Sequence, residues 1–81
     1  MLTVSVISPE KVLFEGSASA VVAPGWDGEI GVLPGHAPLM TVLGTGLLRL
    51  DGTSASFRVS GGFMQVVDNV VRVVTESATP V

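Results

Sequence analysis

Few residues of this 81-residue chain have side chains suited to catalysis, and their spacing does not assemble a site. His36 is the only histidine and cysteine is absent, so any nucleophilic mechanism would need His36 as its base. The surrounding segment GHAP, at residues 35–38, is typical of a tight turn. Asp27 and Glu29 flank Gly28 but lack the ligand number of a calcium loop. The sequence therefore predicts no catalytic residue and no metal site.

The glycine patterns do not match those of phosphate-binding loops. Gly25, Gly28 and Gly31 have the spacing GxxGxxG, and no Lys-Ser or Lys-Thr pair follows them. The segment GTG at residues 44–46 lacks the third glycine and the following helix of a dinucleotide fingerprint. We expect no nucleotide-binding residues and no cofactor.

The composition excludes several partner classes. The net charge is −3 and the four basic residues are scattered, so nucleic acid and anionic membrane surfaces are poor partners. Apolar runs stay far below the ~20 residues that cross a bilayer, and the absence of cysteine favours a reducing compartment. We expect a soluble intracellular protein without membrane insertion. Its 47% hydrophobic content indicates either a surface covered by a partner or simply a β-protein rich in Val and Ala.

Alternation with a period of two predicts strands. Ala55, Phe57 and Val59 alternate with polar residues over residues 54–60, and shorter stretches elsewhere repeat this pattern. No window has a helical apolar period. The sequence predicts one all-β domain spanning residues 1–81, built as a two-sheet antiparallel β-sandwich or flattened barrel of eight or so short strands.

Turn residues separate the expected strands. The pairs at 51–52 (Asp-Gly) and 68–69 (Asp-Asn) predict tight type I′ hairpins, because both tolerate positive φ. The pair Glu15-Gly16 is expected to separate residues 11–14 from residues 17–23. Residues 24–38 contain four Gly and three Pro, which predicts either a binding loop or a structural corner. Trp26 within it is expected to cap the end of the core rather than anchor an interface.

Two motifs carry a family resemblance. The segments GEIGVLPGHAPL (residues 28–39) and VSGGF (residues 59–63) resemble the epsilon subunit of bacterial F-type ATP synthases. The resemblance implies a ten-stranded β-sandwich in the central stalk that binds the gamma subunit and rests on the membrane rotor ring. It also implies a non-catalytic role in coupling proton translocation to ATP synthesis, peripheral to the cytoplasmic face of the bacterial plasma membrane.

The resemblance implies a rotor-ring contact at residues 28–31. Glu29 corresponds to the acidic position facing the ring, with Gly28, Ile30 and Gly31 shaping its loop. An exposed carboxylate at a loop apex can pair with basic groups at little desolvation cost. The alternative is that Glu29 is only a solubilising surface charge.

The resemblance also implies a gamma-subunit contact at Ser8 and His36. The alternative for His36 is that it only completes a turn by bonding a backbone carbonyl. Family members continue beyond residues 76–78 into a two-helix regulatory domain, whereas this sequence ends at Val81. We therefore expect neither helix-mediated inhibition nor ATP binding in this molecule.

Two rival functions come from other classes. A lipoyl-type carrier domain has similar size and composition, and would be modified at Lys11, the only lysine. Lys11 lacks the Asp-Lys context and the chain lacks the symmetric half-repeats of that family. A small hydrolase would require His36 in turnover, and no companion residues support it.

Overall fold

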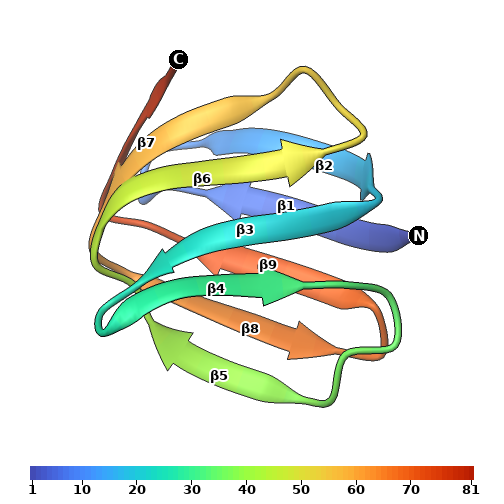
Figure 1. Ribbon diagram of the computed structural model, residues 1–81. Helices are drawn as coiled ribbons and strands as arrows, with labels where there is room; N and C mark the ends of the chain where they lie inside the picture. Colours follow the sequence, from blue (N-terminus) through green and yellow to red (C-terminus); the bar gives the residue numbers. More distant parts are fainter.

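The computed structural model describes residues 1–81 and contains ten strands (Figure 1). None of its elements is a helix long and apolar enough to span a membrane. The strands are β1 (Leu2–Ile7), β2 (Val12–Ala18), β3 (Ala20–Gly25), β4 (Gly28–Val32), β5 (Leu39–Val42), β6 (Thr45–Asp51), β7 (Ser56–Ser60), β8 (Phe63–Val67), β9 (Val70–Val74) and β10 (Ser77–Pro80).

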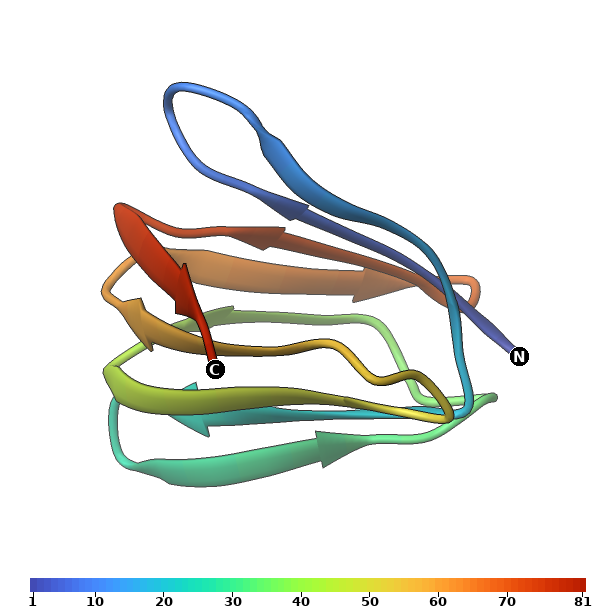
Figure 2. The ribbon, with the colours of Figure 1, turned by 90° about the horizontal axis from the view of Figure 1, so that it is seen from above.

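The strands form two five-stranded sheets packed as two layers (Figure 2). Sheet I has the order β2-β1-β9-β8-β5, and sheet II has the order β10-β7-β6-β3-β4. The predicted all-β sandwich is confirmed, and the sheets do not close into a barrel. All neighbouring strands are antiparallel except β1 and β9, which are parallel. Sequence alternation did not predict this parallel pair, because the two strands lie at opposite ends of the chain.

The core lies between the sheets and is almost wholly aliphatic. Alternate residues of most strands point inward, as the period of two predicted, so Phe57 and Val59 are buried while Arg58 is exposed. Sixteen buried apolar residues form one cluster. The inward positions of β1 and β9 are filled by Leu2, Val4, Val6, Val71 and Val73.

The β8–β9 turn confirms the predicted type I′ hairpin. Asp68 and Asn69 both have positive φ values, 49° and 63°, as this two-residue turn requires. The side chain of Asn69 also accepts a hydrogen bond from the backbone N–H of Gly35, at 2.7 Å. The turn therefore fastens the β4–β5 loop to the end of sheet I.

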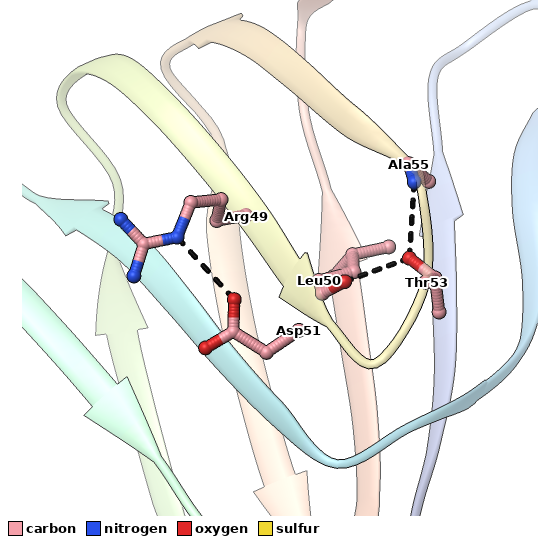
Figure 3. Close-up of polar contacts among 5 residues, drawn as sticks. All are labelled: Arg49, Leu50, Asp51, Thr53 and Ala55. Atoms are coloured by element: carbon pink, nitrogen blue, oxygen red, sulfur yellow. Dashed lines mark hydrogen bonds and ion pairs between the residues drawn. The ribbon is translucent and has the colours of Figure 1, made fainter.

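The β6–β7 connection is longer than predicted. β6 ends at Asp51 and β7 begins at Ser56, and of the intervening residues only Gly52 has positive φ. The hydroxyl of Thr53 donates to the carbonyl oxygen of Leu50 at 2.7 Å and accepts from the N–H of Ala55 at 3.0 Å (Figure 3). The prediction of a two-residue hairpin was wrong because this side chain closes a wider turn.

A further expectation about connections was wrong. Glu15 and Gly16 do not separate strands, because both lie within β2 and pair with β1, and the chain breaks instead at Ser19. Residues 24–38 contain the edge strand β4, with a turn at residues 26–27 before it and a loop at residues 33–38 after it. Glycine is tolerated in β4 because this is an edge strand with few ladder hydrogen bonds to lose, and two of the three prolines of the segment lie in the loop.

Thr75 is the one buried polar residue, with 1% of its surface exposed. Its hydroxyl donates toward the carbonyl oxygens of Gly61 and Ser77, at 3.0 and 2.9 Å, and so joins the β7–β8 and β9–β10 connections. We expect Thr75→Val to lower the free energy of unfolding by about 1–3 kcal/mol, because it keeps the shape but removes a part-buried hydroxyl donor from two backbone carbonyls. Urea denaturation measures this change. Thr79→Val, at an exposed position of β10, should leave stability nearly unaltered; equal effects of the two variants would contradict the structural role of Thr75.

Candidate functional site

The outward surface of sheet I carries a continuous group of exposed apolar side chains. It extends over β5, β8 and β9, where the register places Val42 opposite Phe63 and Val67 opposite Val70. Each member is between 39% and 63% exposed. We call this surface the apolar face, defined by Met40, Val42, Phe63, Val67 and Val70.

The outward surface of sheet II has a different character. Its strands present charged groups, among them Arg49 and Asp51, whose side chains form the only ion pair of the molecule at 3.3 Å (Figure 3). Arg58 is exposed on the neighbouring strand β7. The apolar face of sheet I therefore differs in polarity from the outer surface of sheet II. Contiguous exposed apolar groups mark interaction sites in soluble proteins, so the apolar face favours the interpretation that the high apolar content reflects a covered surface.

The residues predicted to contact the rotor ring lie at the start of β4. Glu29 is exposed and points away from the core, opposite Pro24 of β3. Gly28 has a φ of 141° and closes the β3–β4 turn, and Gly31 is also exposed. Ile30 instead packs against the core. Glu29 is therefore in an edge strand and not at a loop apex, because the pairing with β3 extends to the Gly25–Gly28 pair.

Trp26 lies at the tip of the β3–β4 turn and is 69% exposed. The expectation that it caps the core was wrong, since the buried residue beside this turn is Leu43, which bridges to Gly25. The backbone N–H of Trp26 donates to the carbonyl oxygen of Val42 at 3.1 Å. This contact sets the turn beside the apolar face, so Trp26 adds an exposed aromatic group to the end of that surface.

Ser8 and His36 lie at opposite ends of sheet I. Ser8 follows β1, where its hydroxyl donates to the carbonyl oxygen of Lys11 at 3.3 Å. His36 is half-buried in the β4–β5 loop, and its Nδ1 bonds the carbonyl oxygen of Ala37 at 2.6 Å, which requires the proton on Nδ1. This bond gives His36 the turn-completing role weighed as an alternative. A surface that contacts both residues has to extend along the strands of sheet I.

The structure brings no catalytic constellation together. No three or more His, Asp or Glu side chains are grouped as metal ligands. One shallow hollow of about 290 Å³ is present, on the outer surface of β8 and β9, lined by Gln65, Val67, Val70 and Arg72. The sequence reasoning missed the apolar face. The available signal was the doublets VV at 66–67, 70–71 and 73–74, which place apolar residues at both inward and outward positions and so break the alternation of apolar and polar residue types.

Comparison with known proteins gives one consistent family. Residues 1–81 match the family described as "ATP synthase, Delta/Epsilon chain, beta-sandwich domain". The ATP synthase epsilon chain of Leptospira borgpetersenii is 47% identical over 77 residues, covering 93% of this chain and 61% of the relative. That of Pelotomaculum thermopropionicum is 44% identical over 75 residues, covering 90% of this chain and 56% of the relative. The chain thus spans less than two thirds of either relative.

Solved structures agree in fold. A chain of the mitochondrial ATP synthase of Euglena gracilis, solved as OSCP/F1/c-ring, superposes with a TM-score of 0.89 at 27% identity, over 98% of this chain and 52% of that chain. A chain of the Tetrahymena thermophila mitochondrial ATP synthase gives a TM-score of 0.83 at 18% identity, over 96% of this chain and 65% of that chain. None of these matches supports the lipoyl-type carrier alternative at Lys11. The chain belongs to the family of ATP synthase delta/epsilon chain β-sandwich domains.

Proposed function

We propose that this chain is the β-sandwich of an epsilon subunit that works through protein contacts in the central stalk of an F-type ATP synthase. It links the gamma subunit to the membrane rotor ring and helps couple proton translocation to ATP synthesis. The observation that carries the proposal is the apolar face: a family member with no grouped catalytic side chains has one outer surface suited to burial against another protein.

In this proposal the chain is a subunit of an enzyme complex and has no active site of its own. Membership of the ATP synthase family supports the first part. The second part is supported by the surroundings of its one histidine, which bonds a neighbouring backbone carbonyl and no acidic or nucleophilic side chain. The complex is membrane-associated. Within it, the chain lies peripherally on the cytoplasmic face of the bacterial plasma membrane.

The gamma subunit is the proposed partner of the apolar face. Burial of exposed apolar surface contributes roughly 25 cal/mol per Å² removed from water, so this face gains more from a partner than the charged surface of sheet II. Ser8 and His36 lie at the two ends of sheet I, so a partner that covers this sheet along its strands reaches both positions.

The rotor ring is the proposed partner of the β3–β4 end. The relative from Euglena gracilis was solved together with a c-ring, which supports a ring contact for this domain. Glu29 is exposed on an edge strand, so its carboxylate can pair with a basic group at little desolvation cost. Gly28 and Gly31 leave space around it, and Ile30 anchors the strand to the core.

The test is direct binding to the gamma subunit and rotor ring of the same organism. We expect the folded chain to bind gamma in calorimetry and to join gamma and the ring in one complex in sedimentation. A chain that gives the dispersed amide spectrum of a folded protein but binds neither component would overturn the proposal.

Neutralising Glu29 should affect coupling and not folding. In reconstituted ATP synthase we expect Glu29→Gln to lower ATP-driven proton pumping relative to ATP hydrolysis by about two- to five-fold. This factor corresponds to the loss of one exposed ion pair, which is worth up to ~1 kcal/mol. Asp68→Asn, a matched change at an exposed turn of the opposite end, is the control. Equal coupling in both variants would identify Glu29 as a solubilising charge.

A further inference from the structure

The hollow beside the apolar face is lined by two polar and two aliphatic side chains. It lies between β8 and β9 and is lined by Gln65, Val67, Val70 and Arg72, with a volume of about 290 Å³. The register sets Gln65 directly opposite Arg72, and Val67 opposite Val70. A guanidinium and an amide therefore line an otherwise aliphatic recess.

Arg72 has no acidic partner within the chain. Its direct neighbours in register are Gln65 on β8 and Ser5 on β1, neither of which is charged. The nearest acidic residue along this row is Glu15, which pairs with Ser5 from β2. Its backbone lies two strands away from that of Arg72, about 10 Å at the usual strand spacing. The single ion pair of the molecule is on the opposite sheet. In the free chain, water has to solvate the Arg72 guanidinium.

A partner that covers the apolar face would remove this water. A guanidinium buried without a counter-charge is strongly unfavourable, so a tight complex needs an acceptor at this point. Carboxylates match the planar donors of arginine with two parallel hydrogen bonds, and such pairs are stronger than bonds between neutral groups. The recess also has room for the side chain that would bring a carboxylate to Arg72.

We propose that the hollow receives an aspartate or glutamate side chain from an apolar segment of the gamma subunit. Its carboxylate pairs with Arg72 and accepts a hydrogen bond from the amide of Gln65, while its aliphatic stem packs between Val67 and Val70. This inference rests on the proposed function and adds the chemistry of the contact. Arg72 is then a specificity-determining residue, since a gamma segment without a carboxylate here would leave a buried charge unpaired.

The first test compares two arginines on opposite sheets. Calorimetry with the gamma subunit should show about 30-fold weaker binding for Arg72→Gln and more than about 100-fold weaker binding for Arg72→Glu, as expected for a covered charge pair. Arg58→Glu, the matched change at an exposed central position of sheet II, should bind like the parent chain. Thermal unfolding of all three variants checks that the fold is retained.

The second test identifies the partner carboxylate. Arg72→Lys places an amine in the hollow, and carbodiimide treatment of its complex with gamma should couple that amine to one acidic side chain of gamma, found by mass spectrometry. Replacing that acidic residue by lysine should restore binding to Arg72→Glu. Coupling at Lys11 alone, with none at position 72, would contradict the proposed pairing.

The outcomes separate the two proposals. If Arg72→Glu binds gamma like the parent chain while Val42→Asp does not bind, gamma covers the apolar face and the carboxylate pairing is wrong. If the folded parent chain does not bind gamma, the proposed function fails, and the inference fails with it. If sedimentation shows a dimer that Arg72→Glu dissociates, the occupant is a second copy and not gamma.

Discussion

Replacing Gly62 by alanine should prevent this chain from folding to its native state. Gly62 follows β7 in the segment VSGGF and has a φ of 105°. A Cβ atom there would collide with the carbonyl oxygen of Val74 and would lie 2.7 Å from the Cα of Thr75. These are backbone atoms at the end of β9 and in the residue after it, so the collision is relieved only by separating the β7–β8 connection from them.

The expected cost exceeds about 4 kcal/mol, a large part of the 5–15 kcal/mol that stabilises an ordinary domain. Circular dichroism and amide spectra of Gly62→Ala should show an unfolded or molten chain. Gly35→Ala is the matched control: Gly35 also has positive φ, 86°, but an added Cβ would meet nothing within 4 Å. That variant should lose only about 1–2 kcal/mol. A Gly62→Ala protein as stable as Gly35→Ala would show that the close approach is not rigid.

A charge on the apolar face should abolish binding to the gamma subunit without unfolding the chain. Val42 is 58% exposed on the edge strand β5, between Phe63 and the β3–β4 turn. Val42→Asp would bury an unpaired carboxylate in the complex, and we expect at least a 100-fold loss of affinity, about 2.7 kcal/mol or more. Calorimetric titration with gamma measures the loss.

Leu47→Asp is the control for this substitution. Leu47 is 42% exposed on the outward surface of sheet II, so the change introduces the same charge at an exposed aliphatic position of the other sheet. We expect both variants to unfold at similar urea concentrations and only Val42→Asp to lose gamma. If both bind equally well, the apolar face is not the gamma contact.

Local chemistry in the sequence determined the fold class and several of its elements. The alternation at residues 55–59 identified a strand and its buried face, because side chains of a strand point to opposite sides. The Asp68-Asn69 pair identified a hairpin, because its backbone geometry depends on only two residues. The absence of companions for His36 argued against catalysis, and the motif at residues 28–39 pointed to the family before any geometry was known.

Only the tertiary structure decided which surfaces are available to partners. Pairing with β1 carried β2 through Glu15 and Gly16, although the local sequence favours a turn there. The parallel β1–β9 pair joins strands that are distant in sequence. In β8 and β9, either valine of a doublet could point into the core, and the pairing of the two strands decides which one does. The apolar face, the hollow at Arg72 and the exposure of Trp26 therefore follow from sheet register, a long-range property that the residues of one strand do not encode.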